Sequence, residues 1–306
     1  MYRFATEDEK KQVKDLWELC FEDHDPYLGY YFNCFWRTQD ALVAIKDNKV
    51  VSALHMIPRT LVWGGKILQC DYIAGVSTLP DYRGQCHAAE LMRHSFDVSQ
   101  SRKADASILV AAIDGYYEPM GYVSCFHHLT YSFAANQVPP PPREFTFRVA
   151  TADDLPLILN LYNNFFRRFG VYVKRDHALF THIVQSMACY DGGITLTYHD
   201  GQCVGYFVCA IEQAALHIYE FVYTTQTAIG SLFDFISVQN RPFNRVQIYS
   251  GYGDALLSHL YGHFVKIQLV PSVMVKPFTF STDNLPQLFG NISGQNRQDN
   301  FLNLLG

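Results

Sequence analysis

The residues best suited to chemistry in this sequence are Arg83-Gly84-Gln85-Cys86-His87-Ala88, between a predicted strand and a predicted helix. The first amides of a helix lack carbonyl partners and lie at the positive end of the helix dipole, so a loop that ends there can bind a diphosphate. Gly84 lets the backbone approach such a ligand without a Cβ, and Arg83 can add a charge-assisted contact to a phosphate oxygen. An ordinary strand-to-helix turn with a surface arginine explains the same residues equally well.

The flanking sequence supplies the elements that would position this loop. Residues 67–80 form a β-rich stretch that ends at Pro80, and apolar residues at helical spacing follow the loop. These apolar positions are Ala88, Leu91, Met92 and Phe96. The pattern predicts a strand, a loop and a helix in that order. A further apolar strand is predicted at Ser107–Ala112.

Two stretches resemble motifs of the GNAT acetyltransferase superfamily. Val76–Ala88 is similar to the acyl-CoA motif V-x-x-x-P-x-x-R-G-x-G-x-G/A, and Cys86 is the one marked position that differs. It replaces the second glycine, keeps the amide donor and adds a side chain near the phosphates. After the second strand, Tyr117–Tyr122 resembles the Y-x-x-F-G-F/Y turn of the family. Two such motifs at this separation are far more specific than either alone.

The resemblance implies an acetyl-CoA site. By it, the backbone of residues 76–78 pairs with the pantetheine arm, and Arg83 with the following amides holds the pyrophosphate. The implied cofactor-binding residues are Val76, Ser77, Thr78, Arg83, Gly84, Gln85, Cys86, His87, Ala88, Ala89, Ala112 and Ile113. No metal is expected.

The resemblance also implies catalytic roles. Tyr117 takes the place of the tyrosine that points its hydroxyl at the CoA sulfur, and as general acid it would protonate the departing thiolate. A packed aromatic is the alternative for Tyr117. Asp71 is the candidate general base, with Tyr72 and His55 nearby in sequence. A lone acidic or histidine side chain on a strand also serves as a local hydrogen-bonding group, so a structural role stays open for each.

An internal repeat indicates two halves. Phe147–Asp153 echoes Tyr2–Asp8, and in both places a short strand precedes a capped amphipathic helix. We therefore expect an α/β (α+β) fold with two tandem GNAT-like domains, each a mixed, largely antiparallel sheet flanked by helices. The expected boundaries are a catalytic domain at 1–138, a proline-rich linker at 139–144, a second GNAT-like domain at 145–278 and a tail at 279–306.

The second half lacks an Arg-Gly loop where the repeat would place one, between Glu220 and Ile229, so we expect it to be non-catalytic. The doubled arrangement is similar to tandem GNAT proteins of the Eis (enhanced intracellular survival) type. Those proteins carry a C-terminal sterol-carrier-like domain for which we expect no counterpart here.

Composition limits the classes of partner that this chain is expected to bind. With a formal net charge of −5, the chain lacks the broad basic surface that nonspecific nucleic-acid binding needs. No run of apolar residues is long enough to span a membrane. The eight cysteines are scattered without metal-site spacing, which is typical of reduced, cytoplasmic thiols. We therefore expect a cytoplasmic protein that binds neither nucleic acid nor membrane. Whether it forms a homo-oligomer stays open.

The function expected from the resemblance is an acetyl-CoA-dependent N-acetyltransferase. It would move an acetyl group from CoA to a primary amine of a small molecule or peptide by direct attack. The alternative is a non-catalytic CoA-binding or sensory protein with the same fold, which the substitution at Cys86 and the unassigned base would suit.

Overall fold

The computed structural model describes residues 1–21, 23–111, 113, 115–138, 141–239, 242–251 and 266–280, with backbone alone at 126–127 and 269–272. The chain forms two compact units. The first contains Met1–Val62, Lys66–Cys125 and the segment that begins at Val273. The second contains Trp63–Gly65 and Phe126–Ser272.

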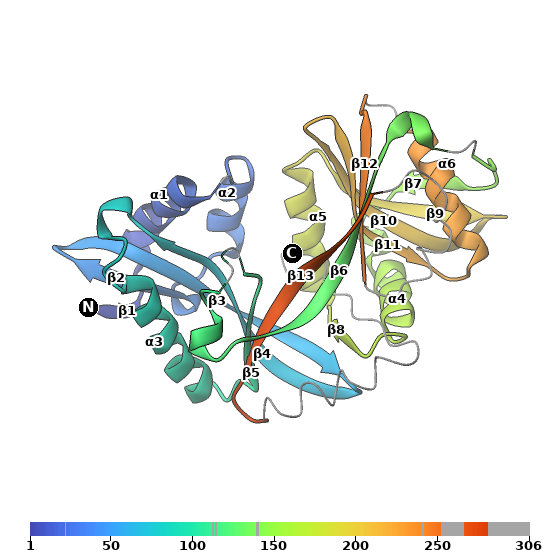
Figure 1. The fold of residues 1–306 in the computed structure, drawn as a ribbon. Coiled ribbons are helices and arrows are strands. Elements are labelled where there is room, and N and C mark those ends of the chain that lie inside the picture. Colours follow the sequence, from blue (N-terminus) through green and yellow to red (C-terminus); the bar gives the residue numbers. More distant parts are fainter. Residues whose placement is uncertain are drawn as a thin grey trace. The chain divides into compact units, whose positions relative to one another are not determined.

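A mixed sheet forms the centre of the first unit (Figure 1). Its strands, in spatial order, are β1 (Tyr2–Phe4), β2 (Ala41–Lys46), β3 (Lys49–Trp63), β4 (Lys66–Thr78), β5 (Ala106–Leu109) and the end of β13 (Lys266–Pro277). Strands β4 and β5 run parallel, whereas β13 pairs with β5 in antiparallel register. A parallel pair needs a long crossover, which the helix after β4 supplies.

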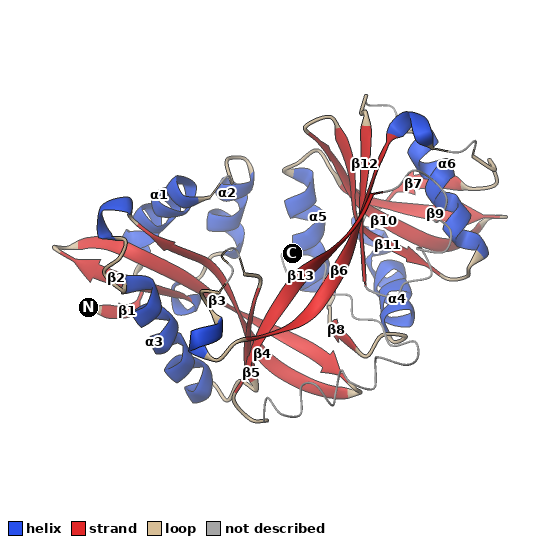
Figure 2. Ribbon diagram, viewed as in Figure 1, coloured by secondary structure: helices blue, strands red, loops and turns tan. Residues whose placement is uncertain are grey.

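Helices cover both faces of this sheet (Figure 2). They are α1 (Lys10–Cys20), α2 (Tyr27–Tyr30) and α3 (His87–Ser101). Successive strand residues point to opposite faces, so Leu54 and His55 of β3 enter different cores. Leu54 packs in the cluster under α3, and the ring of His55 lies against Trp17 of α1, with 5.0 Å between ring centroids.

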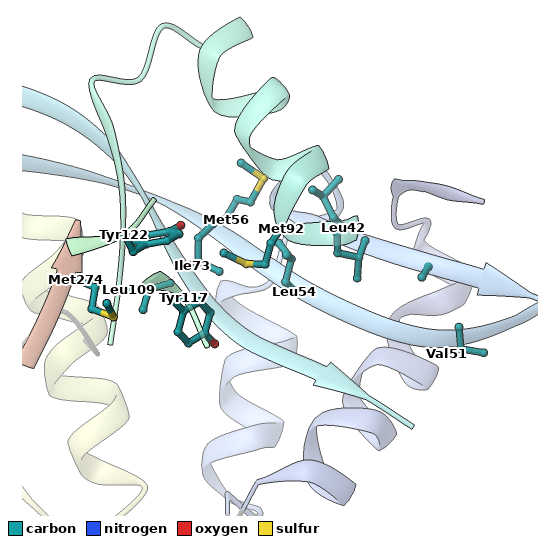
Figure 3. Packing of buried hydrophobic residues seen from close by; sticks show 12 residues of the cluster. Leu42, Val51, Leu54, Met56, Ile73, Met92, Leu109, Tyr117, Tyr122 and Met274 are labelled. Atoms are coloured by element: carbon teal, nitrogen blue, oxygen red, sulfur yellow. The ribbon is translucent and has the colours of Figure 1, made fainter. Parts of the chain in front are cut away.

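The core under α3 joins residues that are distant in sequence (Figure 3). Its buried members are Leu42, Ala44, Val51, Leu54, Met56, Ile73, Leu91, Met92, Leu109, Tyr117, Tyr122 and Met274. The helical spacing predicted from Leu91 and Met92 is confirmed, since both side chains are fully buried on the inner face of α3. This core therefore includes Tyr117, the predicted catalytic residue.

The second unit repeats the mixed architecture. Its strands, in spatial order, are β6 (Val123–Ala134), β12 (Arg245–Gly251), β11 (Ala215–Tyr223), β10 (Gln202–Glu212), β9 (Gly193–His199) and β7 (Thr146–Val149). Its helices are α4 (Leu155–Phe166), α5 (His177–Ala188) and α6 (Ser231–Ser237), and β8 (Val171–Val173) is a short additional strand. Successive residues of β10 point to opposite faces of the sheet. Tyr206 lies near Tyr162 of α4 and Arg175, whereas Phe207 stacks on Phe235 of α6. α4 and α6 therefore cover opposite faces.

The local geometry of the predicted repeat is the same in both units. The amide of Thr6 donates to Glu9, and that of Thr151 donates to Asp154. Each carboxylate also pairs with an arginine of the preceding strand, which is Arg3 in the first unit and Arg148 in the second. The fold class expected from the sequence, α/β with mixed sheets flanked by helices, is confirmed.

Two unit boundaries differ from the expected ones. The main segment of the second unit begins at Phe126, ahead of the proline run, of which Pro139 and Pro140 lie outside the described residues. Val273–Pro277, which the repeat assigned to the second half, belongs to the first unit because Met274–Pro277 pairs with β5. The partner of a strand depends on long-range pairing, which local sequence patterns do not encode.

Candidate active site

The strand before the loop separates from its neighbour where the cofactor would enter. β4 and β5 pair from Cys70 opposite Ala106 to Ile73 opposite Leu109, where β5 ends. β4 continues to Thr78, so along the described part of the chain its last five residues have no partner on the β5 side. This leaves backbone donors and acceptors exposed to a ligand, as an edge strand does.

A glycine bends β4 at this point. Gly75 has φ of +59°, and a Cβ there would lie 2.4 Å from Cζ3 of Trp17. Both the left-handed backbone and the close indole therefore require glycine. Beyond the bend, the hydroxyl of Ser52 on β3 donates to the carbonyl of Ser77 at 2.6 Å and lies 2.8 Å from Oγ1 of Thr78. The predicted pantetheine residues thus have a fixed position on the free end of β4.

The predicted pyrophosphate loop leads from β4 into α3. A short 3-10 turn at Pro80–Tyr82 is followed by Gly84, with φ of +75°, and by Cys86, with φ of +61°. Cys86 is the N-cap of α3, and its carbonyl accepts from Glu90 in the first helical hydrogen bond. Within the described residues, no acceptor takes a hydrogen bond from the amides of residues 84–89. The loop therefore presents a row of free donors at a helix N-terminus.

Positive charge surrounds this loop. Arg83 donates through Nε to the carbonyl of Thr78 at 3.2 Å, which holds its guanidinium beside the end of β4. Lys46, the last residue of β2, donates to Oε1 of Gln85 at 3.0 Å and lies 5.3 Å from the ring centroid of Tyr82. Lys46 was not predicted, because it is close to the loop only through the sheet. No local pattern in the sequence marks it.

His87, Ala88 and Ala89 form the first turn of α3. The side chain of His87 lies 3.2 Å from the hydroxyl of Tyr2 through Nδ1, and its Nε2 has no hydrogen-bond partner in the described part of the chain. Burial and the charge of Lys46 lower the pKa of His87 below 6.5. The imidazole is therefore neutral at pH 7, and the positive charge at the loop comes from Arg83 and Lys46.

Tyr117 lies in the same unit, in the turn after β5. Its side chain is 7% exposed and packs edge-on against Tyr116 and Tyr122, with centroids 4.9 and 5.9 Å away. Burial, and then the neighbouring Tyr116, raise the pKa of Tyr117 to about 12, so the phenol stays protonated at neutral pH. The neighbouring Tyr122 pairs its hydroxyl with Ser107, and among the described residues no such partner is found for the hydroxyl of Tyr117. Of the two remaining predicted cofactor residues, Ile113 is 63% exposed and Ala112 lies outside the described residues.

Asp71 is bound at the other end of α3. Its carboxylate accepts from Ser99 at 2.6 Å and lies 3.4 Å from Nη1 of Arg102. Both partners belong to the C-terminal end of a helix that is ~20 Å long at 1.5 Å per residue, whereas the loop is at its N-terminus. These contacts favour a structural role for Asp71 over that of general base.

His55 and Tyr72 are also buried. Nδ1 of His55 lies 2.8 Å from the hydroxyl of Tyr31, and burial lowers the pKa of His55 to about 3. Burial raises the pKa of Tyr72 well above 10. A histidine with so low a pKa is a weak base, and a tyrosine with a raised pKa stays protonated near neutral pH. Neither side chain therefore suits removal of a proton from an ammonium group.

The second unit has a different arrangement at the equivalent point. β11 and β12 run parallel from Ala215 opposite Arg245 to Ile218 opposite Ile248, after which β11 continues paired with β10 but, in the described part of the chain, without a partner on the β12 side. Glu220 then lies two residues past the last pair, as Gly75 does in β4. Its carboxylate is buried and accepts from Arg175 at 3.0 and 2.9 Å and from Tyr206 at 2.7 Å. A buried ion pair thus occupies the position at which the first unit packs the indole of Trp17 against Gly75.

Among the residues that the structure describes, no helix is long and apolar enough to cross a membrane. The same residues contain no group of three or more histidine, cysteine, aspartate or glutamate side chains placed to bind a metal.

Comparison with known proteins gives the same family as the motifs. The family described as Acetyltransferase (GNAT) domain matches residues 1–125. N-alpha-acetyltransferase 30 of Schizosaccharomyces pombe is 29% identical over 133 residues, which are 40% of this chain and 85% of that protein.

Solved structures match nearly the whole chain. A conserved protein of Enterococcus faecalis, described as a probable N-acyltransferase, has a TM-score of 0.77 at 19% identity over 91% of this chain and 72% of its own. Eis1 from Mycobacterium abscessus has a TM-score of 0.67 at 12% identity over 90% of this chain and 73% of its own. These likenesses show the fold. Together with the loop geometry, the family match identifies residues 1–125 as a GNAT acetyltransferase domain.

Proposed function

We propose that the first unit binds acetyl-CoA and transfers its acetyl group to a primary amine of a small molecule or peptide by direct attack. The observation that carries this proposal is the loop at residues 84–89, whose unpaired amides follow a strand that has separated from its neighbour. The same unit holds Tyr117 with a protonated hydroxyl. These are the parts that acyl transfer from a thioester of a diphosphate carrier requires.

The loop would hold the pyrophosphate. Amides at the N-terminus of α3 donate to phosphate oxygens, and the helix dipole adds a favourable field. Arg83 and Lys46 add two positive charges at the two sides of the loop. The backbone of β4 from Val76 to Thr78, which in the described part of the chain has no strand on its β5 side, would pair with the amides of the pantetheine arm and so direct the thioester along the strand.

Proximity and hydrogen bonding would then drive the transfer. A backbone N–H on the free end of β4 can donate to the thioester oxygen, which gains charge as the amine attacks, and loss of one such donor costs about 3 kcal/mol in other enzymes. Holding the two reactants together removes much of the remaining barrier.

Tyr117 would act on the sulfur. A pKa of about 12 makes its phenol a weaker acid than a thiol, whose ordinary pKa is about 8.5. The hydroxyl would therefore keep its proton and donate a hydrogen bond to the sulfur as the C–N bond forms and the C–S bond breaks. CoA would leave as the thiolate, and the proton lost by the amine would pass to solvent water. This role differs from that of the general acid implied by the resemblance, because the burial that raises the pKa of Tyr117 was not visible in the sequence.

The acceptor class follows from the family and its relatives. The yeast relative is named an N-alpha-acetyltransferase, so α-amino groups of peptides belong in any test beside small primary amines. A GNAT fold serves many acceptors on one cofactor site, and fold alone does not select among them.

Calorimetric titration of the full chain with acetyl-CoA and CoA tests cofactor binding, and thiol release tests transfer across a panel of peptides and small amines. We expect both ligands to bind and at least one amine class to release CoA. No binding at millimolar ligand would refute the proposal. Binding without transfer to any amine would instead support a non-catalytic CoA-binding protein.

A further inference from the structure

The end of β13 reaches the turn that carries Tyr117, although it lies more than a hundred residues later in the chain. Met274 pairs with Leu109 and Pro277 with Ala106, so this segment is the antiparallel neighbour of β5. The segment and the turn both belong to the first unit. In the core under α3, Met274 lies next to Leu109 and close to Tyr117 (Figure 3).

Lys276 makes a specific contact with this turn. Its ammonium donates to the carbonyl of Met120 at 2.6 Å and lies 4.5 Å from the ring centroid of Phe96 on α3. Burial lowers the pKa of Lys276. The carbonyl and the aromatic ring both contact the ammonium of this partly buried side chain. A charge-assisted hydrogen bond of this kind is stronger than a neutral one.

The contact continues by hydrogen bonds to Tyr117. The amide of Met120 donates to the carbonyl of Tyr117 at 3.0 Å, so the residue held by Lys276 is itself bound to the catalytic residue. Gly121 follows with φ of +88°, and a Cβ there would lie 2.9 Å from Nζ of Lys276. The glycine thus provides both the left-handed turn and the space that the ammonium occupies.

The other side of the turn is fixed independently. The hydroxyl of Tyr122 lies 2.6 Å from Oγ of Ser107 on β5, and the Tyr122 ring packs against Tyr117. Without Lys276, the peptide between these anchors would lose its contact with β13. Rotation of that peptide would move the Tyr117 backbone, and a hydroxyl displaced by about 1 Å loses much of its catalytic effect.

From these contacts we propose that Lys276 is a positioning residue for Tyr117, so that acyl transfer in the first unit depends on a strand supplied by the C-terminal part of the chain. This inference rests on the proposed function, in which Tyr117 donates to the CoA sulfur.

The test compares Lys276→Met, which keeps an unbranched apolar stem but removes the donor, with Lys276→Arg, which restores a donor. Lys266→Met is the matched control, because Lys266 is an exposed lysine at the start of the same strand. We expect Lys276→Met to lower kcat about 10- to 100-fold with the Kd for CoA within about twofold of wild type. Lys276→Arg should recover most of kcat, and Lys266→Met should match wild type.

A double-mutant cycle separates positioning from general damage. In the Tyr117→Phe background the hydroxyl is absent, so Lys276→Met should lower kcat no further. A loss of kcat that is equally large in both backgrounds, or a wild-type kcat in Lys276→Met, would overturn the proposal. If Lys276→Met does not fold, Lys276→Gln carries the same cycle with the same two outcomes.

The cycle also distinguishes this inference from the proposed function. If the wild-type chain neither binds acetyl-CoA nor transfers the acetyl group, the function itself is wrong. If the wild-type chain is active and Tyr117→Phe is impaired while Lys276→Met is not, only the positioning role is wrong.

Discussion

At the scale of single residues, Cys86 is where this chain departs from the acyl-CoA motif, and the structure gives the physical reason why glycine is usual there. Cys86 has φ of +61°. A left-handed residue with a Cβ costs about 1–2 kcal/mol, whereas glycine adopts this conformation freely. The sequence showed the substitution but not the backbone angle that makes it strained.

Cys86→Gly should therefore stabilise the chain. Part of the relieved strain is offset by the greater freedom of glycine in the unfolded state, which leaves a net gain of about 0.5–1 kcal/mol in the free energy of unfolding. CoA affinity should also rise, because the side chain near the phosphates is gone. Urea denaturation and calorimetry measure the two effects. Cys86→Ala is the control, since it removes sulfur but keeps the Cβ; equal behaviour of the two variants would contradict the strain argument.

Tyr117 carries the second prediction at this scale. Tyr117→Phe should lower kcat about 10- to 100-fold and leave the Kd for CoA nearly unchanged, because only the hydroxyl that faces the sulfur is lost. Tyr116→Phe, at the partly buried neighbour, should keep kcat close to wild type. Steady-state kinetics on the best amine measure the effect, and an unimpaired Tyr117→Phe would exclude the hydroxyl as the proposed hydrogen-bond donor to the sulfur.

His55 predicts a pH dependence of stability. Its pKa is lowered to about 3 in the folded chain, whereas an unfolded histidine titrates near 6.5. The unfolded state therefore binds the extra proton first, so this contribution to stability is complete above pH 6.5 and is lost as the pH falls toward 3. Between these values the slope is about 1.4 kcal/mol per pH unit.

Urea denaturation from pH 7 to pH 4 measures this slope in wild type and in His55→Asn, which keeps a hydrogen-bonding group for Tyr31 without a titrating ring. The variant should be less stable at pH 7 but should lose less stability on acidification. Parallel curves for the two proteins would rule out His55 as the source.

At the scale of elements, β4 shows which parts of the site a sequence can predict. The strand, the loop and α3 were all predicted from the spacing of apolar residues and from the positions of proline and glycine. The structure confirms their order. The bend at Gly75 was not predicted, because its cause is Trp17 of α1, which contacts the glycine only in the folded unit. The contact of Lys46 with Gln85 and the hydrogen bond from Ser99 to Asp71 were not predicted either, because both join residues that are distant in sequence and meet only in the folded unit.

Gly75→Ala tests the bend. The added Cβ meets both an unfavourable φ and the indole of Trp17 at 2.4 Å, so the free energy of unfolding should fall by about 3 kcal/mol. Gly65→Ala is the matched control, because Gly65 has φ of +82° with no atom near the added Cβ, and it should cost only about 1 kcal/mol. Thermal or urea unfolding compares them. Equal losses would mean that the indole contact does not fix the bend.

At the scale of the whole molecule, the repeat predicted the mixed architecture of both units. It did not predict that the end of β13 would join the sheet of the first unit. Internal similarity between Tyr2–Asp8 and Phe147–Asp153 is local, and the structure shows the same capped turn in each. The pairing of Met274–Pro277 with β5 is long-range, so a boundary drawn from local patterns placed it in the other unit. A catalytic unit of residues 1–138 alone would lack this strand.

The two units also lead to different expectations for CoA binding. The strand of the second unit that corresponds to β4 carries Glu220 in a buried pair with Arg175, whose side chains are 4% and 2% exposed. No Arg-Gly loop lies between Glu220 and Ile229, so no pyrophosphate site is expected there. Calorimetry should therefore give one CoA per chain. A stoichiometry of two would contradict the assignment of the second unit as non-catalytic.

The central claim is that the amides of residues 84–89 and the hydroxyl of Tyr117 form one acetyl-CoA site, and a crystal structure of the full chain with CoA tests it most directly. We predict pyrophosphate oxygens within hydrogen-bond distance of the amides at the start of α3, and the sulfur beside the hydroxyl of Tyr117. Pyrophosphate bound elsewhere, or a sulfur directed away from Tyr117, would contradict the account.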